Sequence, residues 1–553
     1  MRIGLLALLL SLLVAGCGGG SGARGDDVAA AGFTNPVIAG QYPDPSAIRA
    51  ADGSFWLTTT SRAWAPVFPL FRSRDLVNWT RVGGIFERAP DWMAGPFWAP
   101  ELTRWGADGG VRVYYTARPR GVRDPLPCIG VASAPGPGGP YRDRGRPLFC
   151  PPSGAIDAFV LRDEHGRPQL LFRRYRNGGG IWAVPLRSDG LALAGRARLL
   201  LAPGPDDGGV VEGPAVVRHD GAFTLLFATG SCCRPPCDYR EATARSRSLL
   251  GPYVRDPQPL LRDGERLRCD GHGTVVGDGR GRQWLLHHGV LDDDPLNVRR
   301  SVVLDPLRWG GDGWPLAGDD GKPIDSGAAP LGVRQRPAPS PTPSLAGTRL
   351  DPGWEWPSDA PARARQRDGR IVLRGAPRGA VLARQVPAGD LRATVRVRAA
   401  GCTPGLAAVS GGQTAGETYG VELTRRGETR AWQAETAAGA GETLATAALP
   451  IGGTGAGTEG AGAGTTGAGT TGAGTAGAGT EGAGAAVADL AVELRDGGEH
   501  VRFAARQAGG DWRDLGTEAT SPADQRAIRI ALTCRGPRGS SASFSDLAIA
   551  PLG

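Results

Sequence analysis

A short sequence unit recurs five times in the first half of the chain, and it constrains the fold more than any other feature. Each copy places a polar residue before an apolar strand, a glycine turn and a second apolar or aromatic strand. The polar positions are Asp44, Glu101, Asp157, Glu212 and His272, spaced by 57, 56, 55 and 60 residues. A fixed period of this length indicates a repeat architecture, in which each unit is one supersecondary element.

Each repeat has room for about four short strands, and none shows a helical period. This is the size of a propeller blade, so five copies predict a five-bladed β-propeller over residues 33–316. The 88 glycines and 46 prolines also favour a turn-rich, all-β fold. Because the innermost strands of a propeller line its channel, we expect the five polar positions to meet at the axis. A β-sandwich with accidental spacing is the alternative.

The rest of the chain divides into a linker and a second domain. Residues 317–349 contain the proline-rich run Pro337–Pro343, which predicts a semi-extended linker. Residues 350–553 return to alternating runs such as Leu391–Val397, and these predict a β-sandwich. A Gly/Ala/Thr segment at 452–485 buries too little apolar surface to become ordered. We expect a surface loop there, with a fibrous β-stack as the alternative.

Residues 1–17 have the pattern of a secretion signal. Arg2 precedes a 12-residue apolar run that is too short to span a membrane. The run leads into Val14-Ala15-Gly16-Cys17, which resembles the bacterial lipobox, where the cysteine is acylated after cleavage. We therefore expect lipidation at Cys17, a tether at residues 18–32, and a membrane-anchored protein of the bacterial cell envelope, exposed outside the cytoplasm. An ordinary secretory signal that happens to contain Cys17 is the alternative.

The other eight cysteines are an even number, which suits disulfides in an oxidising compartment. Their spacing suggests the pairs Cys128–Cys150 and Cys402–Cys534. The remaining four are expected to pair among themselves, in an order that the sequence does not fix: Cys232, Cys233, Cys237 and Cys269. A zinc site is the alternative for these four, but the two adjacent cysteines fit ligand spacing poorly.

The charge pattern argues against a nucleic-acid partner, although the formal net charge is +8. Lys322 is the single lysine, and the arginines are scattered among acids without a dense basic run. Nucleic acids are bound by clustered basic residues, so no such partner is expected.

Four acids and a histidine that converge on one channel point to chemistry, because buried charges are costly without a purpose. The sequence shows no phosphate-binding loop, no nucleophile elbow and no His-x-x-x-His metal pattern. A group of carboxylates suits glycoside hydrolysis, in which one carboxylic acid protonates the leaving oxygen and another carboxylate activates water.

Five ordered motifs resemble glycoside hydrolase family 43 over residues 33–316. They are Tyr42-Pro43-Asp44-Pro45-Ser46, Ser73-Arg74-Asp75-Leu76-Val77-Asn78-Trp79, Trp98-Ala99-Pro100-Glu101, Ala155-Ile156-Asp157-Ala158 and Val211-Glu212-Gly213-Pro214. The family fold is a five-bladed propeller, and the family inverts the anomeric carbon. The resemblance implies that Asp44 is the general base and Glu212 the general acid. Asp157 matches a third carboxylate that orients the acid and favours its protonated form, and inversion implies a base–acid gap of about 6.5–9.5 Å.

The resemblance also implies residues that bind substrate or an ion. His272 aligns with a channel histidine that, in arabinanase-like relatives, lies near a cation, often calcium. No cofactor is otherwise required, and calcium prefers oxygen ligands, so hydrogen bonding is the alternative role for this imidazole. Glu101 stands where the family commonly has Asp, and its longer side chain is expected to reach further into the pocket. Trp98 and Phe68 are candidates for stacking on a sugar, with core packing as the alternative.

The C-terminal half has a weaker resemblance, carried by Gly353-Trp354-Glu355-Trp356-Pro357 and Ile371-Val372-Leu373-Arg374-Gly375. These segments are similar to the concanavalin-like β-sandwich of β-xylosidase members. The implied function is inverting hydrolysis of arabinose- or xylose-containing plant polysaccharides or oligosaccharides by a monomer, with arabinan and arabino-oligosaccharides favoured. The alternatives are an exo-acting α-L-arabinofuranosidase or β-xylosidase, and a glycan-binding propeller without activity.

Overall fold

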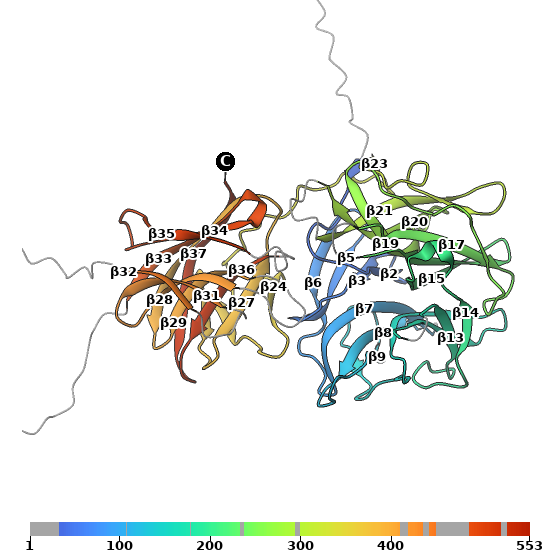
Figure 1. The fold of residues 1–553 in the computed structure, drawn as a ribbon, viewed down its shortest axis with the longest axis horizontal. Helices are drawn as coiled ribbons and strands as arrows, with labels where there is room; N and C mark the ends of the chain where they lie inside the picture. Colours follow the sequence, from blue (N-terminus) through green and yellow to red (C-terminus); the bar gives the residue numbers. More distant parts are fainter. Residues whose placement is uncertain are drawn as a thin grey trace, which may run out of the picture.

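A computed structural model describes residues 32–106, 108–176, 179–232, 237–292, 299–409, 418–434, 442–448, 486–520 and 528–552. Within these ranges the chain forms two bodies, a propeller and a sandwich, which lie side by side (Figure 1). The helical elements of the described residues are two single turns of 3-10 helix, η1 (Pro205–Asp207) and η2 (Asp496–Gly498). The all-β prediction is therefore confirmed. The predicted signal with Cys17, most of the tether and the insertion at 452–485 lie outside the described residues.

The described propeller residues form five four-stranded antiparallel sheets, each built from strands consecutive along the chain except where β4 intervenes. Blade I contains β2 (Ser46–Arg49), β3 (Phe55–Thr58), β5 (Val67–Ser73) and β6 (Trp79–Phe86). Blade II contains β7 (Met93–Trp105), β8 (Gly110–Pro119), β9 (Cys128–Ala134) and β10 (Arg142–Asp143). Blade III contains β11 (Ala155–Arg162), β12 (Pro168–Arg174), β13 (Ile181–Pro185) and β14 (Arg198–Leu201). Blade IV contains β15 (Val211–His219), β16 (Ala222–Thr229), β17 (Arg240–Ser246) and β18 (Val254–Arg255). Blade V contains β19 (Leu267–Gly277), β20 (Gln283–Leu291), β21 (Arg300–Trp309) and β22 (Pro315–Ala317).

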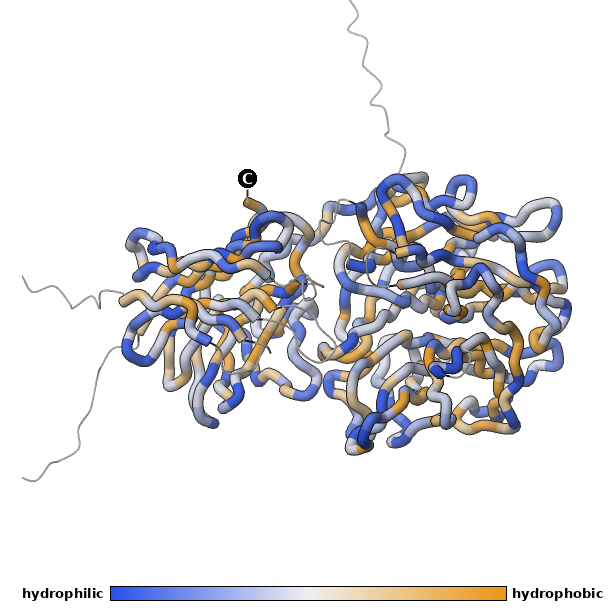
Figure 2. The backbone as a smooth tube through the Cα atoms, viewed as in Figure 1, coloured by the Kyte–Doolittle hydropathy of each residue, from blue (hydrophilic) through white to orange (hydrophobic). Residues whose placement is uncertain are grey.

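The first strands of the blades form the inner ring of the propeller. Strands β2, β7, β11, β15 and β19 contact one another in this order, and β19 returns to β2, so the ring is closed. The five-bladed prediction is thus confirmed, and the start of each blade faces the axis. Figure 2 shows the hydrophobic stretches running along the strands, while the loops at the rim are more hydrophilic.

The propeller extends beyond the predicted boundary at residue 316. Strand β1 (Gly32–Thr34) pairs with β23 (Ser326–Ala328), and this pairing joins the two ends of the propeller. Ala329 is 5% exposed and packs in the same core as Phe33. The predicted linker at 317–349 was therefore placed too early, because its first part carries a strand and core residues that the proline count obscured.

The second domain is a sandwich of two antiparallel sheets. One sheet has the order β32 (Glu442–Ala448), β31 (Glu428–Ala434), β30 (Thr418–Leu423), β29 (Thr403–Val409), β36 (Arg529–Arg535), β27 (Ala380–Gln385), β24 (Trp354–Pro357) and β4 (Trp64–Ala65). The other has the order β25 (Ala364–Arg367), β26 (Arg370–Arg374), β37 (Ser541–Pro551), β28 (Leu391–Ala400), β33 (Val487–Arg495), β34 (His500–Arg506) and β35 (Arg513–Ala519).

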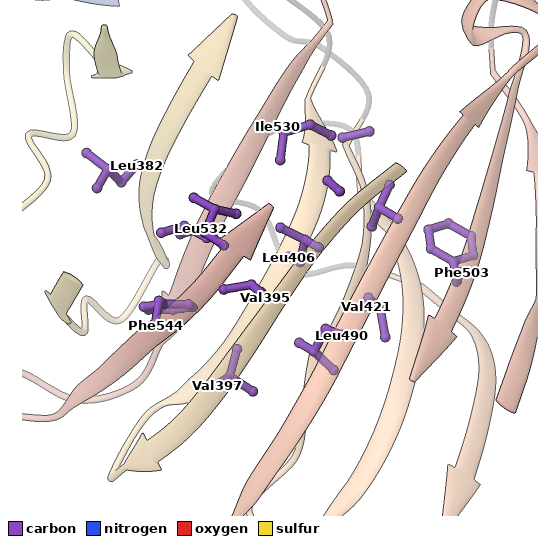
Figure 3. Close-up of a cluster of buried hydrophobic side chains, with 14 of the residues drawn as sticks. Leu382, Val395, Val397, Leu406, Val421, Leu490, Phe503, Ile530, Leu532 and Phe544 are labelled. Carbon is purple, nitrogen blue, oxygen red and sulfur yellow. The ribbon is translucent and has the colours of Figure 1, made fainter. Parts of the chain in front are cut away.

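In the sandwich, the alternation of apolar and polar residues along a strand corresponds to an alternation of buried and partly exposed side chains. In β28, Leu391, Ala393, Val395 and Val397 are at most 3% exposed, while the residues between them are partly exposed. The buried faces of the two sheets meet in one apolar cluster, in which side chains such as Leu406, Leu532 and Phe544 interdigitate (Figure 3). The alternating run Leu391–Val397 thus forms a strand of a β-sandwich, as predicted.

The two domains share a sheet and a buried ion cluster. Strand β4 belongs to the propeller segment of the chain, yet it pairs with β24 at the edge of the sandwich, with Ala65 opposite Trp356. Beside this pairing, Glu355 of the sandwich accepts hydrogen bonds from Arg81 of blade I (2.7 Å) and from Arg529 (2.6 Å). The sandwich is thus fixed to blade I by main-chain and charged contacts.

Three disulfides join described cysteines: Cys128–Cys150, Cys237–Cys269 and Cys402–Cys534. The two predicted pairs are confirmed. The third confirms pairing within the group of four and disfavours the zinc alternative, while Cys233 lies outside the described residues. Among the described residues, no helix has the length and apolarity needed to cross a membrane.

Candidate active site

In each blade, one residue at or just before the inner strand lies in the left-handed backbone region at a matching position, and these five residues are the equivalent positions of the blades. They are Asp44, Ala99, Asp157, Gly213 and His272, with φ of 57°, 39°, 56°, 58° and 54°. The predicted equivalence was therefore correct for three blades and wrong for two. Glu101 lies two residues after the left-handed position of blade II, and Glu212 lies one residue before that of blade IV. Proline after the turn in three of the blades marks the correct register.

Asp44 lies at the start of blade I among hydrogen-bond donors. Its Oδ2 accepts from the hydroxyl of Thr60 (2.6 Å), and its Oδ1 accepts from Nη1 of Arg300 (3.2 Å). The Nδ1 atoms of His288 and His272 lie 3.4 Å and 3.6 Å from Oδ1. Burial raises the pKa of this carboxyl, but the guanidinium of Arg300 and the imidazole of His272 outweigh burial and hold the pKa well below its usual range. Asp44 is therefore ionised, as a general base must be.

Glu212 lies on β15, and both of its carboxylate oxygens have partners. Nη1 of Arg173, on β12, donates to Oε2 (2.7 Å), and the hydroxyl of Tyr239 donates to Oε1 (2.9 Å). The Glu212 side chain is 13% exposed, whereas Tyr239 is 2% exposed. Burial, together with the nearby carboxylates, raises the pKa of Tyr239 well above its usual range, so its hydroxyl stays a donor.

Asp157 connects blade III to the blade that carries Glu212. Its Oδ2 accepts the backbone N–H of Gly213 (3.2 Å), and its own N–H donates to the hydroxyl of Thr116 (3.2 Å). Burial raises the pKa of Asp157 to about 7; the imidazole of His272 opposes this rise, and the neighbouring carboxylates add to it. The structure thus brings Asp157 beside Glu212. Its predicted action on the acid stays a prediction.

His272 lies at the centre of the acids. Burial lowers its pKa, but four surrounding carboxylates raise it above the ordinary value overall. A raised pKa favours the protonated imidazole, and calcium prefers oxygen ligands. Among the described residues, no group of three or more His, Cys, Asp or Glu side chains is arranged to hold a metal ion. The described residues around His272 therefore do not fit a calcium site built from protein ligands.

The three predicted sugar-binding residues have different environments. Phe68 has 0% exposure and packs against Phe97 and Tyr115, so the prediction that it stacks on a sugar is wrong; its ring belongs to the core between blades I and II. Trp98 is partly exposed, with its ring centroid 6.5 Å from that of Tyr175, and it remains a candidate for stacking.

Glu101 lies in the wall between two blades. It is 8% exposed, and its Oε2 accepts from the hydroxyl of Ser46 on β2 (2.6 Å). Burial raises the pKa of Glu101 to about 8. The expected reach into the pocket is replaced by a contact between blades I and II, because this residue lies two positions beyond the turn that faces the axis.

Five residues that contact the acids were missed by the sequence analysis: Thr60, Arg173, Tyr239, His288 and Arg300. All lie on or beside the second and third strands of the blades, outside the blade-start motif. One sequence signal could have revealed two of them: a polar residue within or next to an otherwise apolar strand. His288 interrupts the apolar run of β20, and Arg300 opens the apolar run of β21.

The fold and the site define a class of protein: a five-bladed propeller with several carboxylates at its axis, an arrangement that suits glycoside hydrolysis. The model of glycosyl hydrolases family 43 matches residues 33–315, just over half of the chain. The chain belongs to this family.

Relatives and solved structures agree with this assignment. A non-reducing end α-L-arabinofuranosidase from Bacteroides ovatus is 26% identical over 323 residues, 52% of this chain and 54% of that protein. An extracellular endo-α-(1→5)-L-arabinanase from Bacillus subtilis is 26% identical over 298 residues, 49% of this chain and 86% of that protein. The chain thus spans about half the length of the first of these relatives. A crystal structure of a GH43 protein from Bacillus licheniformis matches with a TM-score of 0.73 at 18% identity, covering 94% of this chain and 100% of that chain, so the likeness of fold includes the sandwich.

Proposed function

We propose that this protein is an inverting glycosidase that cleaves arabinose- or xylose-containing glycans. The observation that carries the proposal is an ionised Asp44 on the same axis as Glu212 and Asp157. Asp44 removes a proton from water as the water oxygen attacks the anomeric carbon. Glu212 gives its proton to the departing glycosidic oxygen, so one C–O bond forms and one breaks in a single step, with inversion.

The surrounding side chains support these roles. Thr60 and Arg300 orient the Asp44 carboxylate and keep it charged, while Tyr239 holds one oxygen of Glu212. Arg173 holds the other oxygen of Glu212 and is 17% exposed.

Arabinan and arabino-oligosaccharides are the favoured substrates, supported by the likeness to the arabinofuranosidase and the arabinanase. The position of the sandwich favours attack at chain ends. Its Gln385 accepts the N–H of Gln41 (2.8 Å), and its Val386 carbonyl accepts from Arg299 (2.9 Å), beside the site residues Asp44 and Arg300. The sandwich thus contacts the propeller within three residues of Asp44 in the sequence. A β-xylosidase is the second candidate, supported by the two-domain architecture.

The test is hydrolysis of aryl arabinofuranosides, aryl xylosides, linear arabinan and xylan by the wild-type chain and by Asp44→Asn and Glu212→Gln. We expect Asp44→Asn to lower kcat on every substrate, and Glu212→Gln to lower kcat on the polysaccharides, by about 100- to 10,000-fold, because each removes a proton-transfer group. NMR of the first product should show the inverted anomer. Glu164→Gln is the matched control, since Glu164 is an exposed glutamate that hydrogen bonds to Ser248. Activity that persists in both site variants contradicts the roles, and binding without turnover favours a glycan-binding propeller.

We also propose that Cys17 carries a lipid that anchors the protein to a membrane of the bacterial cell envelope, outside the cytoplasm. The lipobox-like Val14-Ala15-Gly16-Cys17 supports this. In a bacterial host, labelled fatty acid should enter the wild-type protein and move it to the membrane fraction. Cys17→Ser should abolish both, whereas labelling of Cys17→Ser at the wild-type level contradicts the anchor.

A further inference from the structure

Two stacked rings lie between the base and the acid. The rings of Tyr239 and His288 have centroids 5.5 Å apart and planes within 9° of parallel. Tyr239 directly precedes β17 in blade IV, and His288 lies on β20 in blade V. One ring contacts the proposed acid and the other contacts the proposed base.

The His288 ring holds the backbone of Asp44. The N–H of Asp44 donates to Nδ1 of His288 (3.3 Å), and this N–H belongs to a residue with φ of 57°. His288 has 0% exposure, and burial lowers its pKa to about 3, so the ring is neutral and Nδ1 can accept. The imidazole therefore fixes a backbone conformation that non-glycine residues seldom adopt.

The Tyr239 ring is held from several sides. A methyl group on Gly271 would come within 2.7 Å of it, so β19 approaches the ring as closely as a glycine allows. Cys269, which is disulfide-bonded to Cys237, packs in the same cluster. The ring has little freedom, and its hydroxyl is directed at Oε1 of Glu212 (2.9 Å).

We propose that Tyr239 and His288 form a rigid spacer that sets the distance between general base and general acid. Both are positioning residues, and the inference rests on the proposed function. Inversion needs a gap between the two carboxylates that admits one water, and a misplacement of about 1 Å can cost about 100-fold in rate. A stacked pair that ends on Asp44 at one side and on Glu212 at the other supplies such a fixed spacing.

Tyr239→Phe tests the acid end while the ring and the stack remain. The substrates are para-nitrophenyl and phenyl glycosides of the sugar that the wild type hydrolyses. A good leaving group departs without protonation, so kcat for the para-nitrophenyl glycoside should change less than about 3-fold, whereas kcat for the phenyl glycoside should fall about 10- to 100-fold. Tyr114→Phe is the matched control, because this tyrosine is also buried and donates one hydrogen bond, to the carbonyl of Gly190.

His288→Asn tests the base end, because it removes the ring and the stack. Water activation is needed for every leaving group, so kcat should fall by the same factor for both glycosides. His219→Asn, which removes a histidine stacked on Trp309, is the control. Equal losses on both substrates in Tyr239→Phe, or wild-type kinetics in both site variants, overturn the spacer. A wild type inactive on every glycoside contradicts the proposed function instead. Crystal structures then decide the inference, since an unmoved Glu212 carboxylate in Tyr239→Phe overturns it and a displaced one supports it.

Discussion

The propeller and the sandwich both bury glutamates, but they leave them in opposite electrostatic states. Glu101 in the propeller is 8% exposed and has only hydroxyl partners, so burial raises its pKa to about 8. Glu355 in the sandwich is 2% exposed; burial also raises its pKa, but two arginines outweigh this effect and lower it to about 2. The same side chain is thus neutral or charged at pH 7 according to whether guanidinium groups reach it.

Other buried acids of the two domains show the same contrast. Near the propeller axis, burial raises the pKa of Glu241 to about 7 and that of Asp270 to about 8. In the sandwich, Asp489 and Glu493 each lie within 3.0 Å of an arginine nitrogen. The propeller therefore holds several carboxylates with a raised pKa near its axis, beside the ionised Asp44, where a reaction can use them. The sandwich pairs these buried acids with arginines instead.

Glu355→Gln removes the arginine-paired acid of this comparison, and we expect it to lower the free energy of unfolding more than any other proposed substitution. It leaves two buried guanidinium groups without the carboxylate between them, and removal of one partner of a buried ion pair costs about 3–5 kcal/mol. We expect chemical denaturation to show this loss at pH 7. Because Arg81 belongs to blade I and Arg529 to the sandwich, the two domains should also unfold less cooperatively.

Glu355 and Glu101 should make the free energy of unfolding depend on pH in opposite directions. The lowered pKa of Glu355 contributes about 3 kcal/mol above pH 4.5, and this contribution is lost as the pH falls from 4.5 towards 2. Glu355→Gln should lack this acid-dependent loss. A raised pKa costs stability, so through Glu101 the wild type should lose stability as the pH rises from 4.5 to about 8. The matched variant Glu101→Gln should lack this loss at higher pH. Parallel pH profiles for the two variants contradict the comparison.

The sequence was sufficient for the architecture because repeats and alternation are local signals. Five polar blade starts predicted five blades, and the alternating run at Leu391–Val397 predicted the sandwich strand. The edge strand β4 could not be predicted, because Trp64 and Ala65 pair with residues almost 300 positions away. The closing strand β23 was missed for the same reason, since its partner is at the other end of the propeller.

Site residues could be predicted from the sequence only where an acidic residue lay within the repeated blade-start motif. Asp44, Asp157 and Glu212 were found because an acid in a repeated motif stands out. The register of Glu101 was misread, because alignment by charge ignored the backbone turn, which the structure places at Ala99. His288 and Tyr239 were missed, because their roles depend on a contact between blades that no linear pattern records.

Gly213→Ala tests how tightly the propeller axis is packed. We expect a smaller loss of stability than in Glu355→Gln, together with a loss of catalysis. Gly213 has φ of 58°, and an added Cβ would lie 2.8 Å from Cγ and Nδ1 of His272. We expect a loss of about 1–3 kcal/mol from backbone strain. We also expect kcat to fall at least about 10-fold, because either the imidazole or the adjacent Glu212 must move.

Gly221→Ala separates the two causes within the same blade. Gly221 has φ of 73° and nothing within 4 Å of an added Cβ, so this variant has the strain without the collision. It should lose a similar amount of stability, measured by chemical denaturation, and keep wild-type kcat. If Gly221→Ala lowers kcat as much as Gly213→Ala does, strain in the blade rather than contact with His272 limits the reaction. The propeller axis would then be less rigid than its packing indicates. The proposed difference between the two domains, with reactive carboxylates in the propeller and arginine-paired acids in the sandwich, would not hold.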